Sequence, residues 1–128
     1  MTDLVLLYGV RWLLHSEVFG FSEYTVEFGH ESKNQFDITA EQNGQRLVGE
    51  AFNVAPSFFQ GKKAAMLKKL RSKANGATYT VIMCNADAVH GEYVPAKDKR
   101  EHHVFVDVGA GTARMIPGGA AVRAPGDT

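Results

Sequence analysis

Residues 35–52 of the chain read QFDITAEQNGQRLVGEAF, and they contain the clearest structural signal in the sequence. Its centre holds Asn43-Gly44, the strongest short hairpin signal, because both residues tolerate the positive φ angles of a tight turn. The segments before and after that turn are rich in β-branched and apolar residues. The sequence therefore predicts two antiparallel strands, over 35–41 and 46–54.

The segments on either side of this hairpin predict an alternation of helices and strands. Leu7, Val10, Leu14 and Val18 fall on one face of a helix, and Pro56 can open a second one. The expected elements are a helix over 3–19, a strand over 23–28, a helix over 57–74, a strand over 78–85 and a hairpin with strands at 103–108 and 113–116. The second helix provides the crossover that a parallel strand requires, so we expect an α/β fold with a mixed sheet.

Length and composition limit the protein to one domain. The chain has 128 residues, of which 45% are hydrophobic and 22% charged, typical of a globular core. We expect a single domain over 1–116 and a flexible tail over 117–128, which is rich in Gly, Ala and Pro. Residues 87–102 read as a polar segment that contains the charge run 97–101.

Location and charge also restrict the function. The apolar run Leu4–Tyr8 is far shorter than the ~20 residues of a membrane span and lacks the features of a signal peptide, so we expect no membrane and a cytoplasmic protein. One cysteine, Cys84, fits a reducing compartment. Lys+Arg and Asp+Glu are both 14, so any attraction to a polyanion must come from a local basic patch.

Two acidic residues of the hairpin face each other in the predicted register. Asp37 lies on the first strand and Glu50 on the second, 13 residues later (50 − 37). Carboxylates opposite each other repel unless a cation lies between them. Oxygen ligands of this kind suit Mg²⁺ or Mn²⁺, which polarise a phosphodiester and activate water. The alternative interpretation is that both are solvated residues on an exposed strand face.

The order of these elements resembles the PD-(D/E)XK superfamily of nucleases, which includes restriction-endonuclease-like and Holliday-junction-resolvase-like proteins. In that family a helix with Glu and a strand precede a hairpin with Asp and Glu-x-Lys, and a helix and strand follow. Residues 3–86 are similar, with Glu17, Asp37 and Glu50 at the acidic positions. The resemblance implies a restriction-endonuclease-like α-β-β-β-α-β core, a mixed sheet flanked by helices, to which this chain adds a C-terminal hairpin. It also implies that the backbone carbonyl of Ala51 joins the two acids as a metal ligand, while Glu17 completes or orients the site.

Two residues depart from the family pattern. Phe36 stands where the family usually has Pro, and Phe52 stands where it has the catalytic Lys. Some members take this lysine from the helix that follows the hairpin. Lys63 lies within about 40° of Phe59 on the apolar stripe of that helix, so it is our candidate replacement, with Lys62 second. Lys63 can equally be an ordinary lysine whose stem lies along apolar neighbours.

The second helix is also markedly basic. Most of its charges belong to a solvated face, but a face near an acidic site can hold phosphates. We expect nucleic-acid contacts from Lys62, Lys69 and Lys73. No pattern of His and Cys suits zinc.

Two hypotheses follow. The first is a Mg²⁺-dependent nuclease that acts on DNA or RNA with Glu17, Asp37, Glu50 and Lys63 as catalytic residues. The second is a catalytically inactive relative that binds nucleic acid or a partner protein, as an inhibitor or immunity-type protein does. Phe52 and the zero net charge favour the second, and the paired acids and the inward-facing Lys63 favour the first. A homodimer is expected only by analogy, since small nucleases of this fold often cut two strands.

Overall fold

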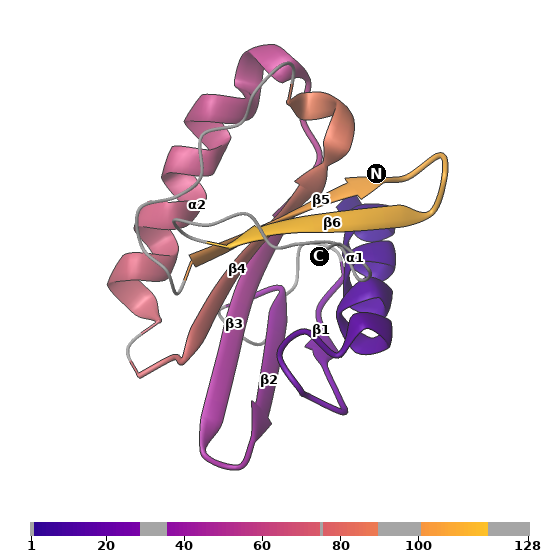
Figure 1. Ribbon diagram of the computed structural model, residues 1–128. Coiled ribbons are helices and arrows are strands. Elements are labelled where there is room, and N and C mark those ends of the chain that lie inside the picture. Colours follow the sequence, from indigo (N-terminus) through magenta and orange to yellow (C-terminus); the bar gives the residue numbers. More distant parts are fainter. Residues whose placement is uncertain (1, 29–35, 75, 90–100, 118–128) are drawn as a thin grey trace.

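The protein is a three-layer α/β structure with one mixed sheet between two helices (Figure 1). The computed structural model describes residues 2–28, 36–74, 76–89 and 101–117. Helix α1 packs on one face of the sheet and helix α2 on the other, each over its own apolar cluster. The α/β class expected from the sequence is therefore confirmed.

The elements follow one another along the chain in the same order as the strands lie in the sheet. The strand order is β1-β2-β3-β4-β5-β6, with parallel pairs β3–β4 and β4–β5 and antiparallel pairs elsewhere. The helices are α1 (Thr2–Ser16) and α2 (Phe59–Lys73), with short 3-10 turns at Pro56–Phe58 and Ala86–Ala88. The strands are β1 (Thr25–Val26), β2 (Ile38–Gln42), β3 (Gln45–Phe52), β4 (Tyr79–Asn85), β5 (Glu101–Asp107) and β6 (Thr112–Pro117).

The hairpin of β2 and β3 has the predicted turn. Asn43 and Gly44 have φ angles of 54° and 79°, as a two-residue turn with both central residues left-handed requires. Gln42 and Gln45 form the last pair before the turn, and Ile38 pairs with Gly49 at the other end. This register fixes the position of everything that follows on β3.

Helix α2 is the predicted crossover between the parallel strands β3 and β4. Pro56 begins a 3-10 turn that leads into the helix, so α2 itself starts at Phe59, two residues later than expected. Phe59, Leu67 and Leu70 are buried against the sheet, as the apolar stripe predicted.

Helix α1 differs from the prediction in length and in rotation. It ends at Ser16, not near residue 19, because Glu17 adopts a left-handed φ of 54° that the helix cannot continue. Leu7 and Leu14, expected in the core, are 52% and 38% exposed. Instead, Gly9 faces the sheet so closely that an added Cβ would clash with Met83 Sδ. The buried face is Val5, Leu6, Gly9, Val10 and Leu13.

The last part of the sheet is the predicted hairpin of β5 and β6, with a longer first strand. Strand β5 begins at Glu101, the end of the expected charge run, and Glu101 is buried. The rest of that run and the predicted tail over 118–128 lie outside the described residues. Within the described part of the chain, neither helix has the length and apolar composition needed to cross a membrane.

Candidate functional site

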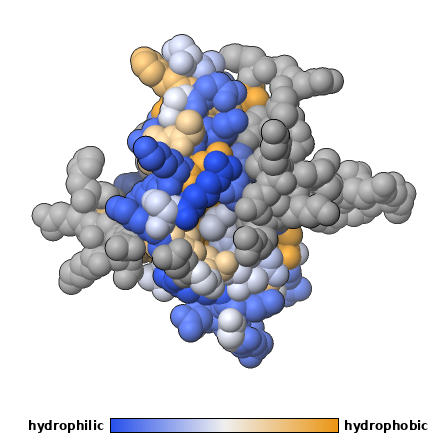
Figure 2. Space-filling model, turned by 90° about the vertical axis from the view of Figure 1, so that its left-hand side faces the viewer, coloured by the Kyte–Doolittle hydropathy of each residue, from blue (hydrophilic) through white to orange (hydrophobic). Residues whose placement is uncertain are grey.

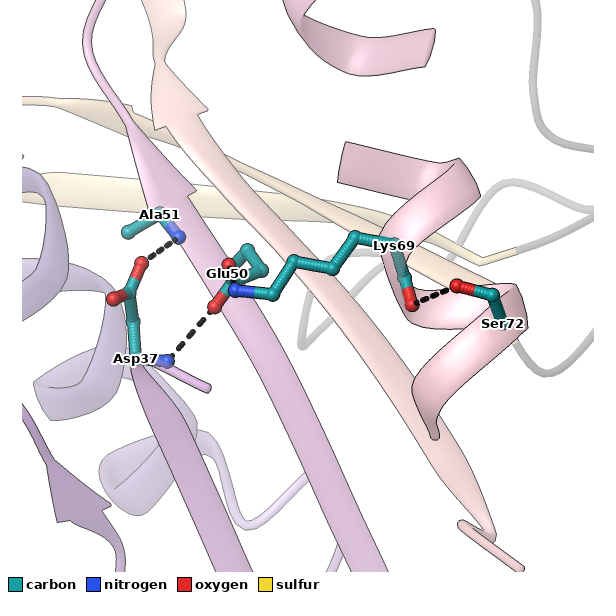
Figure 3. Close-up of polar contacts among 5 residues, drawn as sticks. All are labelled: Asp37, Glu50, Ala51, Lys69 and Ser72. Carbon is teal, nitrogen blue, oxygen red and sulfur yellow. Dashed lines mark hydrogen bonds and ion pairs between the residues drawn. The ribbon is translucent and has the colours of Figure 1, made fainter. Parts of the chain in front are cut away.

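Asp37 and Glu50 come together where β2 begins beside β3. Glu50 lies on β3, and Asp37 immediately precedes Ile38, the first residue of β2 and the partner of Gly49. The backbone N–H of Asp37 donates to Glu50 Oε2 over 2.8 Å, and the backbone N–H of Ala51 donates to Asp37 Oδ2 over 3.0 Å (Figure 3). Each carboxylate is thus oriented by the neighbouring segment of backbone. The predicted adjacency of the two acids is confirmed.

Lys69 of α2 completes this group. Its Nζ forms an ion pair and hydrogen bond with Oε1 of Glu50, and it lies 5.7 Å from the centre of the Phe36 ring. Figure 3 shows the lysine stem extended from α2 across to β3, so that its ammonium meets Glu50 opposite the Asp37 backbone. The helix, the strand and the segment before β2 each contribute one charged side chain.

The buried carboxylate of Glu50 needs a compensating charge, which Lys69 provides. Glu50 is only 4% exposed, and a buried carboxylate is costly unless a charge and hydrogen bonds compensate it. The Lys69 side chain is 30% exposed, so its ammonium lies between the interior and solvent. With Asp37 half-buried beside them, the three side chains carry a formal charge of −1.

Lys63, the lysine chosen from the sequence, occupies another side of the helix. Six residues separate Lys63 from Lys69, which places them about 120° apart around the axis. Nζ of Lys63 lies 5.6 Å from the centre of the Phe59 ring, and burial lowers the pKa of this lysine. The pKa of His103 on β5 is lowered to about 4, by burial first and then by the charge of Lys63. Lys63 thus acts electrostatically on β5, whereas Lys69 pairs with Glu50.

Of the other predicted site residues, Ala51 lies beside Glu50, whereas Glu17, Lys62 and Lys73 are exposed. Glu17 is exposed just beyond α1, the helix that covers the opposite face of the sheet from α2. Ala51 is buried beside Glu50, and its N–H binds Asp37. Lys62 and Lys73 are exposed on α2.

Two further polar networks of the described residues do not follow from the sequence prediction. Arg71 of α2 forms two hydrogen bonds with the buried Glu101, at 2.6 and 2.7 Å. The buried Asn85 side chain binds both backbone groups of Val54 and also donates to Asp87 Oδ1. The Arg71–Glu101 contact has a signal in the sequence, because α2 contains six basic residues and no acid. Acidic partners for such a helix are expected on the sheet that it covers. The second depends on the meeting of two strand ends and has no local sequence signal.

Other reactive groups of the described residues lie apart from this site. Cys84 is buried in β4, and burial, as the largest cause, raises its pKa to about 12, so the thiolate is scarce at neutral pH. No group of three or more His, Cys, Asp or Glu in the described part of the chain has a geometry that would hold a metal ion.

Comparison with known proteins adds no relative to this description. No protein-family model, curated protein or solved structure matches the chain.

Proposed function

We propose that this protein is a metal-dependent, nuclease-like protein that acts on phosphodiesters of DNA or RNA. The observation that carries the proposal is the convergence of Asp37, Glu50 and Lys69 at one point of the sheet. Two acids and one lysine are the residue types of the PD-(D/E)XK site. Here the lysine comes from the helix, because Phe52 fills the strand position and is buried in the core.

The residues of the site have distinct roles in this proposal. The N–H groups of Asp37 and Ala51 orient the two carboxylates, and Lys69 holds the buried Glu50 in place. The partly exposed ammonium of Lys69 also provides positive charge where negative charge develops on a phosphoryl group during attack. The lysine role that the sequence suggested for Lys63 passes to Lys69.

The donor set of the site fits Mg²⁺ or Mn²⁺. Mg²⁺ is typically bound by one or two carboxylates together with waters and substrate phosphates. Asp37 and Glu50 would hold the ion, and the resemblance adds the carbonyl of Ala51. When bound, such an ion polarises a phosphodiester and lowers the pKa of a coordinated water.

A second candidate function is a catalytically inactive relative that binds nucleic acid or a partner protein. One observation favours it: both oxygens of the Glu50 carboxylate already contact protein donors, the Asp37 N–H and Lys69. The group would then serve to attach α2 to β3. The two candidates differ in whether Asp37 and Lys69 matter to chemistry or only to stability.

The test is cleavage of labelled single- and double-stranded DNA and RNA with Mg²⁺ or Mn²⁺. We expect Asp37→Asn and Lys69→Met to lower the cleavage rate by at least about 100-fold, the usual effect of losing one group that stabilises a transition state. Lys68→Ala is the matched control, because Lys68 is an exposed lysine of the same helix and should have little effect. Lys63→Ala shows whether the lysine expected from the sequence contributes.

Metal binding is measured separately by thermal unfolding. An ion at one hundred times its Kd should stabilise the folded protein by about 2.7 kcal/mol. Asp37→Asn should remove this stabilisation. Wild-type protein that neither cleaves any substrate nor responds to the metal would support the inactive relative.

A further inference from the structure

Three lysines of α2, with Lys69 in the middle, form a straight row along the helix. Lys62, Lys69 and Lys73 fall within about 40° around the axis of α2 and span about 16 Å along it. The Lys69 ammonium forms an ion pair with Glu50, whereas the side chains of Lys62 and Lys73, on either side of Lys69 along the helix, are exposed. Figure 2 views the molecule from the α2 side, where hydrophilic side chains cover much of the described surface and hydrophobic ones interrupt them. A polyanion lying along this row would pass directly over the candidate site.

An exposed aromatic ring stands at one end of the row. Phe58, the residue before α2, is 68% exposed, the largest exposure among the large hydrophobic residues described. It lines a cavity of about 600 Å³ whose wall also includes Asn53, Ser57 and Lys62. Ligand sites commonly have volumes of about 300–1,000 Å³. The cavity begins at Asn53, three residues after Glu50.

The backbone around this cavity is held by specific contacts. The Asn85 side chain binds the N–H and C=O of Val54, which attaches the end of β3 to the end of β4. The N–H of Phe58 donates to the carbonyl of Ala55 over 3.0 Å. The backbone that carries Phe58 is held by these contacts while its ring stays exposed, so a flat ligand that stacks on the ring needs little further ordering of the backbone.

We propose that this surface binds a single strand of nucleic acid, with one unpaired base stacked on Phe58 and phosphates at Lys62 and Lys73. Aromatic rings combined with basic tracks are the means by which single strands are bound without sequence preference. A duplex keeps its bases stacked on one another and would have to expose one at a cost. The inference rests on the proposed function, since the strand would cross the Asp37–Glu50 site.

The first test is binding of fluorescent 12-nucleotide single strands of DNA and RNA, and of the matching duplex, to the full chain in EDTA. The chelator prevents cleavage, so affinity alone is measured. Stacking of a base is worth about 5- to 150-fold in affinity, and Phe58→Ala should weaken single-strand binding by that factor. Phe58→Trp should keep the affinity. Phe28→Ala is the matched control, because Phe28 is also exposed, at 47%, and lies outside the row.

The second test measures the lysine row through the salt dependence of binding. Removing one phosphate contact should lower the slope of log K against log salt by about 0.7 for a single strand. We expect this from Lys62→Ala and from Lys73→Ala. Lys68→Ala, about 120° from Lys62 around the axis, should leave the slope unchanged.

The outcomes separate this inference from the proposed function. Equal affinity of wild type and Phe58→Ala for single strands overturns the inference, even when the wild type cleaves. Tighter binding of the duplex than of the single strand, or no binding of any oligonucleotide, also overturns it. Binding that depends on Phe58 in a protein that never cleaves supports the inference and overturns the nuclease proposal alone.

Discussion

The two faces of the sheet bury different kinds of side chain. Under α1, apolar residues such as Leu6, Leu13 and Met83 pack against one another. Under α2, a second apolar cluster shares the interface with two buried carboxylates, Glu50 and Glu101. These carboxylates pair with basic side chains of the helix. Helix α1 is held by burial of apolar surface, whereas α2 is held by both burial and charge.

This difference is the reason that our proposals place chemistry on the α2 side of the sheet. Ion pairs at a helix–sheet contact contribute little net stability, because desolvation offsets most of the attraction. Helix α2 nevertheless carries six basic residues and no acid, and two of them, Lys69 and Arg71, pair with carboxylates of the sheet. In the functions that we propose, these charges serve to bind a charged ligand more than to stabilise the fold. The α1 side then provides the apolar support on which the α2 side depends.

The largest expected effect concerns the α1 side. Leu13 is fully buried there, and Leu13→Ala should lower the free energy of unfolding by about 2–5 kcal/mol, through lost burial and a cavity. Urea denaturation followed by circular dichroism measures the change. Affinity for single-stranded oligonucleotides, measured where the variant remains folded, should stay within about twofold. A large loss of affinity in folded Leu13→Ala would contradict the division between the two faces.

The fold could be predicted where local signals agree with the tertiary structure. Asn43-Gly44 forms the turn because the required φ angles are local, and Pro56 introduces α2 for the same reason. The rotation of α1 could not be predicted from apolar spacing, because Leu7 and Leu14 suggested a face that the protein exposes. The buried face is decided by Gly9, whose contact with the sheet depends on small size and not on hydrophobicity.

The site could be predicted as far as its two acids. The turn fixes the register, and the register sets Asp37 opposite Glu50. Which lysine pairs with Glu50 depends on how α2 is rotated against the sheet. The sequence of the helix alone does not determine this rotation. Lys63 was selected from its position relative to Phe59, but Glu50 lies on the side of the helix that Lys69 faces.

A second prediction concerns pH and the α2 side. Burial, followed by the charge of Lys63, lowers the pKa of His103 from 6.5 to about 4 in the folded protein. Between these two pH values the unfolded chain binds the extra proton and the folded chain does not. The free energy of unfolding should therefore fall as pH decreases from 6.5 to 4, by about 3 kcal/mol for this group, with no contribution at pH 8.

The variant His103→Gln isolates this contribution. Wild type and variant are compared by urea denaturation at pH 8 and again at pH 4.5, so that each protein serves as its own reference. The stability advantage of the wild type should shrink on acidification, because only the wild type has the titrating group. A difference that stays constant with pH would show that His103 is protonated equally in both states.

The smallest effect, and the sharpest measure of the difference between the faces, is the coupling of Arg71 and Glu101. Their two hydrogen bonds form a bidentate pair, but the Arg71 side chain is 58% exposed, so solvent screens the attraction. A double-mutant cycle with Arg71→Met and Glu101→Gln should give a coupling energy of about 1 kcal/mol from urea denaturation. Glu101→Gln alone should cost more than Arg71→Met alone, because Glu101 is buried and the arginine can return to water. Coupling near zero would mean that the Arg71–Glu101 pair does not hold α2 on the sheet and that, of the two ion pairs, only Lys69–Glu50 can do so.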